Sequence, residues 1–247
     1  MIAGSISGSN GVCYDNSPAT SCLLDAPYGI SLDSSANLLI VNNNNDQILK
    51  VDAVTNLVTV LAGGFAGSTG SPSGYTGDWI TAKYATINSA TDVCADREGN
   101  VYIAELGSHR IRKISLNNGA ISTVAGISSA NGGISTDGSF ASSVYIKQPF
   151  GVRVDITGNV YFSENGNNKV RRVNKLSGIL QTLAGTGTAG SLGDGSAATS
   201  ATLLNPTFVD IDTKGDVYMV HEVSATVAIV RKVSMGTRII STVYLHV

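Results

Sequence analysis

Apolar and polar residues alternate in short segments along this chain of 247 residues, and the pattern is clearest over residues 148–173. Residues 152–155 alternate, residues 160–162 are all apolar, and residues 170–173 begin and end with valine. Clusters of turn-forming residues, TGN and ENGNN, separate these segments. Short segments of this kind, bounded by polar turns, are typical of β-strands. The pattern therefore predicts three short strands joined by tight turns.

The same unit occurs four times, and each copy ends in one more strand. The third strands are expected at residues 48–51, 111–114, 170–173 and 230–233. The fourth strands are expected at residues 57–61, 120–124, 179–183 and 239–243. Because no segment shows helical periodicity, a repeat made of four strands is predicted.

Two sets of aspartates keep the four copies in register. The first set begins each copy, at Asp15, Asp78, Asp137 and Asp194. The second set follows eighteen positions later, at Asp33, Asp96, Asp155 and Asp212. Repeats of four strands, recurring about every 60 residues, are typical of sheets arranged around a common axis. We therefore predict an all-β fold, a β-propeller built of four four-stranded blades.

The predicted propeller is a single domain over residues 1–247. Its blades are expected at approximately residues 5–63, 64–126, 127–185 and 186–247. A chain of this length can bury a sizeable core.

Several segments of the second and third copies resemble NHL repeats. Residues 96–102 read DREGNVY, residues 104–114 read AELGSHRIRKI, and residues 123–126 read TVAG. The resemblance extends over essentially the whole chain, with departures at the four asparagines of residues 42–45 and at His221. NHL propellers commonly have six blades, so four blades imply part of a larger propeller or a subunit completed by neighbouring copies. A closed ring of four blades is the third arrangement open to this architecture.

The charge balance argues against a dedicated nucleic-acid surface. Lys and Arg total 16, Asp and Glu total 18, and the net charge is −2, whereas such surfaces normally need a basic excess. Two basic clusters nevertheless keep RNA binding as an alternative, because some NHL propellers bind RNA. The clusters are His109, Arg110, Arg112 and Lys113, and Lys169, Arg171, Arg172 and Lys175. Since Arg112 and Lys113 are strand residues that repeat with the blade, we expect such cations to pair with Glu105 and Glu164 or to cover apolar surface with their stems.

Cys13 and Cys22 lie in one loop and form either a small disulfide ring or two free thiols. A disulfide would favour an oxidising compartment. Cys94 is expected to be a buried apolar residue of a strand. Residues 1–11 lack the basic and apolar regions of a signal peptide, and no apolar run is long enough to span a bilayer. We predict an extracellular or cell-surface protein from the possible disulfide, the connections rich in Ser, Thr and Asn, and a charged fraction of 14%, well below the usual ~25%.

The repeated aspartates have a structural and a metal-binding interpretation. Four carboxylates around an axis would suit calcium, which takes several oxygen ligands. The structural interpretation makes the first set caps of short helical turns and places the second set in the turns between first and second strands. Because a repeated residue needs only a repeated structural reason, we assign no metal and no cofactor.

Catalytic residues are not assigned either. The histidines are His109, His221 and His246, and no pair has the spacing of a metal site. Neither does the sequence show a nucleophile beside a base. An enzyme acting at the mouth of the channel, a hydrolase or a lyase, remains the alternative function.

Trp79, Tyr75 and Tyr84 lie in the longest connection between blades. Loop aromatics either pack their own loop or mark a contact surface. We predict a non-catalytic NHL-type propeller, an extracellular binding or structural module that self-associates, with a filament as one form. Its expected partners are other proteins or copies of itself, with glycans as a further class.

Overall fold

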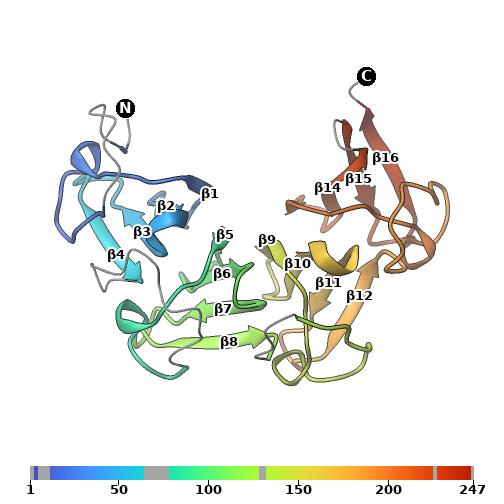
Figure 1. The fold of residues 1–247 in the computed structure, drawn as a ribbon, viewed down its shortest axis with the longest axis horizontal. Coiled ribbons are helices and arrows are strands. Elements are labelled where there is room, and N and C mark those ends of the chain that lie inside the picture. The colour runs from blue at the N-terminus through green and yellow to red at the C-terminus, as the bar shows by residue number, and fades with distance from the viewer. Residues whose placement is uncertain (1–2, 5–11, 64–77, 128–131, 225–226, 246–247) are drawn as a thin grey trace. The chain divides into compact units, whose positions relative to one another are not determined.

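The computed structural model describes residues 3–4, 12–63, 78–127, 132–224 and 227–245. Tyr75, which is predicted to be a contact residue, and His246 lie outside these described ranges. The described chain forms four antiparallel four-stranded sheets, each with its strands in chain order (Figure 1). We call them the first to fourth blades. The predicted all-β fold of four β-propeller blades is confirmed.

Each blade is a short meander of strands. The first contains β1 (Pro27–Leu32), β2 (Leu38–Asn42), β3 (Gln47–Val51) and β4 (Val58–Ala62). The second contains β5 (Ala90–Ala95), β6 (Val101–Glu105), β7 (Arg110–Ile114) and β8 (Ile121–Ala125). The third contains β9 (Pro149–Val154), β10 (Val160–Glu164), β11 (Lys169–Val173) and β12 (Leu180–Ala184). The fourth contains β13 (Val209–Ile211), β14 (Val217–Ser224), β15 (Val227–Val233) and β16 (Ile240–Leu245).

The helical content of the described residues is limited to single turns of 3₁₀-helix. One precedes each blade, as η1 (Ala19–Ser21), η3 (Ala82–Tyr84), η4 (Ala141–Ser143) and η6 (Ala198–Ser200). Two others, η2 (Asn43–Asn45) and η5 (Asn165–Asn167), lie in the turns after β2 and β10. In the fourth blade this turn is replaced by a longer hairpin, because β14 and β15 extend past the ends of their counterparts.

The chain divides into two compact units. The first is Met1–Ser108 with Arg112–Thr123, and the second is His109–Ile111 with Val124–Val247. The first unit contains the first blade and most of the second. The second unit contains the third and fourth blades.

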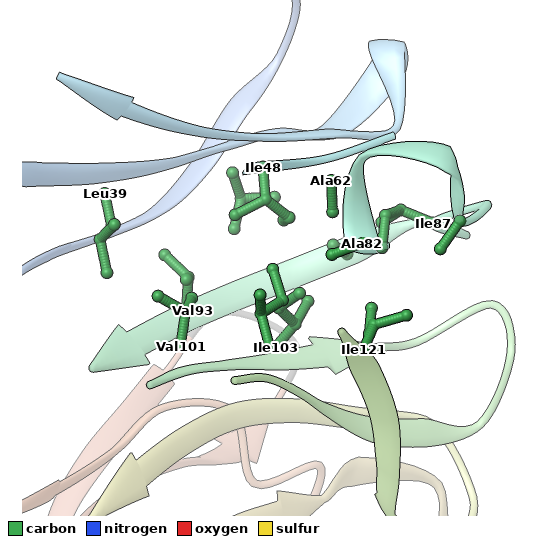
Figure 2. Close-up of a cluster of buried hydrophobic side chains, with 13 residues drawn as sticks. Leu39, Ile48, Ala62, Ala82, Ile87, Val93, Val101, Ile103 and Ile121 are labelled. Carbon is green, nitrogen blue, oxygen red and sulfur yellow. The ribbon is translucent and has the colours of Figure 1, made fainter. Parts of the chain in front are cut away.

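Each unit has a core between its two blades. In the first unit, Leu39 and Ile48 of the first blade face Val93 and Ile103 of the second blade (Figure 2). In the second unit, the corresponding cluster joins the third blade to Val209 and Met219 of the fourth blade, among others. Full burial of an aliphatic side chain stabilises a fold by about 1.5–3 kcal/mol. Alternating apolar residues therefore hold neighbouring blades together within each unit.

The second set of aspartates organises the turn between the first and second strands. Asp155 Oδ1 accepts hydrogen bonds from the backbone N–H groups of Thr157 and Asn159, both at 2.9 Å. Its Oδ2 accepts from Asn159 Nδ2 at 2.7 Å and from the Tyr161 hydroxyl at 3.1 Å. Burial alone would raise the pKa of Asp155, but these hydrogen bonds lower it below its ordinary value. Both carboxylate oxygens of Asp155 thus accept hydrogen bonds within the turn, which is the predicted structural role.

We expect Asp155→Ala to lower the free energy of unfolding by about 2–3 kcal/mol, because two backbone N–H groups and two side chains lose their acceptor. Ile156→Ala is the control, since the Ile156 side chain is exposed in the same turn. Denaturant unfolding followed by circular dichroism would measure both. Equal stability of the two variants would contradict this role.

Candidate functional site

The loop that leads to β5 displays Trp79 on the surface. Its side chain is 82% exposed, and its backbone has a φ of 67°. The other copies place Asn16, Gly138 and Gly195 at this position, all with positive φ. Left-handed backbone costs an ordinary residue about 1–2 kcal/mol, and glycine and asparagine tolerate it best. The backbone of Trp79 is therefore held in an unfavourable conformation, and burial of its side chain does not offset this cost.

Neighbouring contacts hold this loop in place. The Trp79 N–H donates to the Ile121 carbonyl at 2.7 Å. Asp78 accepts from the buried guanidinium of Arg112 at 3.2 Å. Tyr84, at the end of η3, is also largely exposed. Of the predicted contact residues, the structure therefore presents Trp79 and Tyr84 on one anchored connection.

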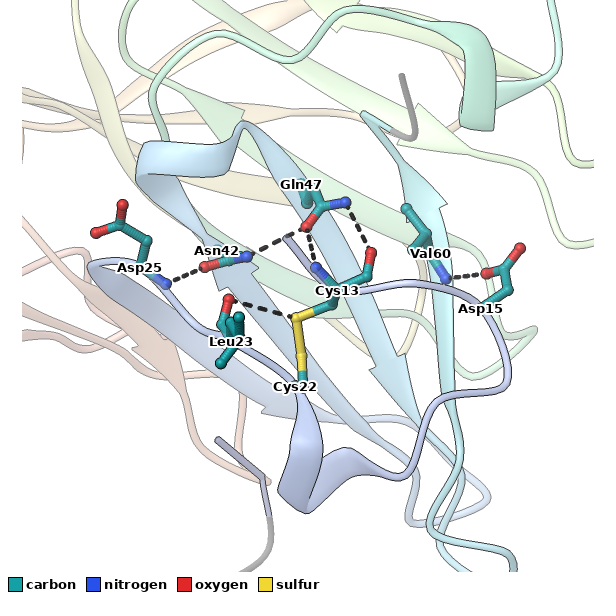
Figure 3. Close-up of a disulfide and its surroundings, with 8 residues drawn as sticks. All are labelled: Cys13, Asp15, Cys22, Leu23, Asp25, Asn42, Gln47 and Val60. Carbon is teal, nitrogen blue, oxygen red and sulfur yellow. Dashed lines mark hydrogen bonds between the residues drawn. A yellow bond between two sulfur atoms is a disulfide. The ribbon is translucent and has the colours of Figure 1, made fainter. Parts of the chain in front are cut away.

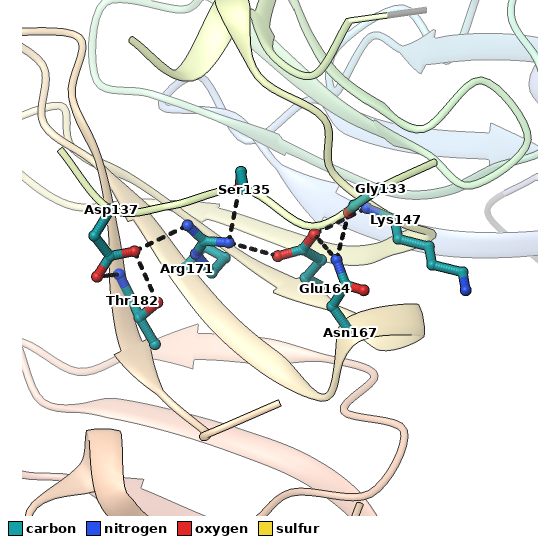
Figure 4. Close-up of polar contacts among 8 residues, drawn as sticks. All are labelled: Gly133, Ser135, Asp137, Lys147, Glu164, Asn167, Arg171 and Thr182. Atoms are coloured by element: carbon teal, nitrogen blue, oxygen red, sulfur yellow. Dashed lines mark hydrogen bonds and ion pairs between the residues drawn. The ribbon is translucent and has the colours of Figure 1, made fainter. Parts of the chain in front are cut away.

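A buried arginine ties the incoming loop to the sheet in three blades. Arg171 of β11 donates to Glu164 at 2.8 Å, to Ser135 at 3.1 Å and to Asp137 at 3.0 Å (Figure 4). Arg112 binds Glu105 and Asp78 in the same way at 3.4 and 3.2 Å. The expected pairing of these arginines with Glu105 and Glu164 is confirmed.

The first set of aspartates does not cap the helical turns, so that prediction was wrong. None of η1, η3, η4 and η6 has a side-chain cap, and the residues at their N-caps are Pro18, Thr81, Phe140 and Ala197. Asp137 accepts instead from the Thr182 N–H at 2.8 Å as well as from Arg171. Each aspartate of the first set stands three residues before the N-cap, and Asp137 there binds the third and fourth strands of its blade.

The first blade lacks the buried arginine and has a disulfide within its incoming loop. Leu49 occupies the arginine position of β3, and Cys13 occupies the position of Ser135. Cys13 and Cys22 form a disulfide (Figure 3). Gln47 also exchanges two hydrogen bonds with the Cys13 backbone, at 3.1 and 3.2 Å. The disulfide thus closes a ring within the loop, both cysteines pack in one cluster with Leu49, and Gln47 binds the loop to β3.

The fourth blade varies the network in another way. His221 stands where the second and third blades have Glu105 and Glu164. It is fully buried, and burial is the main cause that lowers its pKa. Arg231 binds Asp194 at 2.6 Å and the Thr202 carbonyl at 3.1 Å. His221 is therefore a neutral side chain of the blade interior.

His109 also has a structural role. Its Nδ1 accepts from the Gln148 N–H at 3.0 Å, and its backbone has a φ of 56°. Burial, followed by Lys147 and Arg110, lowers its pKa. No three His, Cys, Asp or Glu residues of the described chain are grouped so that they could hold a metal ion.

The repeated cations stack on tyrosines of the neighbouring strand. Lys113 lies 5.4 Å from the ring centre of Tyr102, and Arg172 lies 5.8 Å from that of Tyr161. Lys232 stacks on Tyr218 in the same way at 5.6 Å. Such contacts contribute about 0.5–1 kcal/mol at exposed sites. These cations therefore have partners within their own blades.

One apolar face is more exposed than its counterparts. Ile30 of β1 is 60% exposed, whereas Val93 and Val209 at the same repeat position are 0% and 1% exposed. Tyr28 and Leu32 of the same strand are also exposed. In the first unit β5 is covered by the first blade, and in the second unit β13 is covered by the third blade. No other described element of the first unit covers β1 in the same way.

Comparison with known proteins supports the fold and leaves the family open. No family model matches the chain. Teneurin-1 of Caenorhabditis elegans is 23% identical over 168 residues, which are 61% of this chain and 6% of that protein. The NHL assignment therefore stays a resemblance. No helix in the described ranges is long and apolar enough to cross a membrane.

Several solved structures share the fold at low identity. A structural genomics protein of unknown function from Bacteroides thetaiotaomicron has a TM-score of 0.59 at 18% identity, over 77% of this chain and 43% of that chain. An auxiliary nutrient binding protein from the same organism has a TM-score of 0.57 at 15% identity, over 85% and 52%. Virginiamycin B lyase from Staphylococcus aureus has a TM-score of 0.52 at 13% identity, over 89% and 55%. The chain thus spans about half of each of these proteins.

Reduction should destabilise the first blade, since the disulfide restricts the unfolded chain and closes the loop into a ring. We expect Cys13→Ser with Cys22→Ser to lower the free energy of unfolding by about 2–3 kcal/mol. Dithiothreitol should lower the melting temperature of the wild type and leave that of the double variant unchanged. A wild-type melting temperature that does not respond to the reductant would contradict the link.

The two buried histidines should make stability depend on pH. Their pKa values are lowered in the folded state, so the unfolded chain binds protons more readily. The stability that they contribute is present above about pH 6.5 and is lost as pH falls from there through their folded pKa values. His109→Asn should reduce the loss of melting temperature between pH 7 and pH 5, and asparagine suits this backbone because Asn168 has a φ of 51° at the same position. An unchanged pH profile would contradict the role of His109.

Proposed function

We propose that this chain is a non-catalytic NHL-type propeller module that acts outside the cell in binding and assembly. Its repeated arginines and aspartates bind each other or the backbone, and its described histidines are buried and neutral. The groups that most often perform acid–base chemistry are therefore used to hold the blades. The disulfide and the low charge support an oxidising, extracellular setting.

The exposed face of β1 is the observation that carries the assembly proposal. An isoleucine at the position of Ile30 is normally covered by the preceding blade, as Val93 and Val209 are. The fourth blade has an exposed apolar face that corresponds to the face by which the third blade covers β13. There Val243 is 52% exposed, whereas Leu183 at the same position of the third blade is 4% exposed.

The partner that fits this face is the fourth blade of a second copy. Contact between two different faces is heterologous, so repetition of it produces rings or filaments. Trp79 and Tyr84 would serve a separate contact with another protein or a glycan, since exposed aromatic side chains are common in binding surfaces.

An enzyme is the second candidate function, favoured by the shared fold with virginiamycin B lyase. It would need a bound metal ion or acid–base residues supplied by the connections between strands. Elemental analysis of the purified protein tests the metal form, and stoichiometric metal would favour the enzyme. RNA binding has less support, because the strand cations already stack on tyrosines.

We expect the wild type to self-associate as its concentration rises and Ile30→Asp to remain monomeric, since a carboxylate in the contact would lose its hydration. Ile156→Asp is the matched control, because Ile156 is equally exposed but lies in a turn of the third blade. Sedimentation equilibrium or light scattering over a range of concentrations would measure the masses. A monomeric wild type at high concentration, or assembly of Ile30→Asp, would overturn the assembly proposal.

A further inference from the structure

A pocket of about 340 Å³ lies between the first and second blades, inside the first unit. Asp33 and Lys50 of the first blade form one side of it. Val101, Ile114 and Leu116 of the second blade form the apolar side. Its volume is in the range of about 300–1,000 Å³ that ligand sites occupy.

The other three blades place a tyrosine beside the corresponding aspartate and cation. The hydroxyls of Tyr102, Tyr161 and Tyr218 donate to Asp96, Asp155 and Asp212 at 3.2, 3.1 and 3.3 Å. The strand cations stack on the rings of the same tyrosines. Each tyrosine thus has a cation over its ring and an aspartate that accepts from its hydroxyl.

The first blade has Leu39 at this position. Leu39 pairs with Lys50 across the strands, as Tyr161 pairs with Arg172. Leucine is shorter than tyrosine and has no hydroxyl, so it reaches neither the Asp33 carboxylate nor the space beyond it. The Asp33 carboxylate still accepts the hydrogen bonds of its own turn, which the Ser35 and Asn37 N–H groups and the Asn37 side chain donate.

Comparison of the two units places the pocket beside the position that a tyrosine ring fills in the second unit. Leu39 itself is fully buried and does not line the pocket. In the second unit Tyr161 packs in one cluster with Val217, Val233 and Met235. The equivalents of these three residues in the first unit line the pocket, as Val101, Ile114 and Leu116. Val101 and Ile114 are each 7% exposed, whereas Val217 and Val233 are 0% exposed.

We propose that this pocket binds a phenolic ring, either a small phenol or the tyrosyl side chain of a partner. The ring would lie against the apolar wall with the Lys50 ammonium over its face, and its hydroxyl would donate to Asp33 Oδ2. This arrangement repeats what the chain builds internally in its other blades. The site is separate from the β1 face and from Trp79, so it goes beyond the proposed assembly role and is tested independently.

The test uses p-cresol, the side-chain analogue of tyrosine, with the wild-type protein in a calorimetric or NMR titration. We expect one saturable site with a Kd of about 1 mM, as suits a ligand of this size. Toluene, which lacks the hydroxyl, should bind roughly tenfold more weakly. Leu39→Tyr should fill the pocket and abolish binding.

Two further variants keep the test decisive if Leu39→Tyr folds poorly. Asp33→Asn removes the charged acceptor and should weaken p-cresol binding several-fold while leaving toluene binding unchanged. Tyr161→Leu should open the equivalent space in the second unit and raise the p-cresol stoichiometry from one to two.

N-acetyl-tyrosine amide distinguishes the two sources of the ring. Binding as tight as that of p-cresol supports a tyrosyl side chain of a partner, and binding of p-cresol alone supports a free phenol. Absence of saturable p-cresol binding to the wild type overturns the proposal. So does undiminished binding to a folded Leu39→Tyr, or equal affinity for toluene.

Discussion

A buried guanidinium cannot stay in the interior of a blade without carboxylates, and this requirement shapes the connections between blades. Arg112 and Arg171 are almost completely buried, so each needs its charge neutralised within hydrogen-bond distance. The second strand supplies a glutamate and the incoming loop supplies an aspartate. The ion pair with this aspartate binds the loop to the sheet and fixes the position of the loop residues that follow it. The exposed position of Trp79 depends on this arrangement, because Asp78 is the residue that Arg112 holds.

Variation between the copies follows from the same constraint. Where Leu49 removes the charge, a disulfide within the loop packs against it. Where His221 replaces the glutamate, Arg231 turns to backbone carbonyls. Where Leu39 replaces a tyrosine, a pocket opens beside Asp33 and Lys50. Each departure from the repeat thus has a local structural effect, and the functional candidates of this chain lie at such departures.

Strand positions and the role of the second aspartates could be predicted from the sequence, because both depend on residues close together in the chain. The structure places the fourth strands within about a residue or two of the expected ranges. The role of the first aspartates could not be predicted in this way. Asp137 binds Thr182 on a strand far along the chain, and no local pattern shows that pairing. The sequence does show that Leu39 stands where the other copies have tyrosine. That this difference concerns a pocket could be seen only from the contacts of Tyr161 in the structure.

The loops of the fourth and first blades contain two kinds of link, an ion pair and a disulfide, that respond to different conditions. Strong acid discharges Asp194, whose pKa is lowered by Thr242 and Arg231 against the effect of burial, and so loosens the loop of the fourth blade. The same acid leaves the bond between Cys13 and Cys22 intact, whereas a thiol reductant breaks that bond and spares the ion pairs. An acidic and a reducing compartment would therefore weaken different contacts of the same molecule.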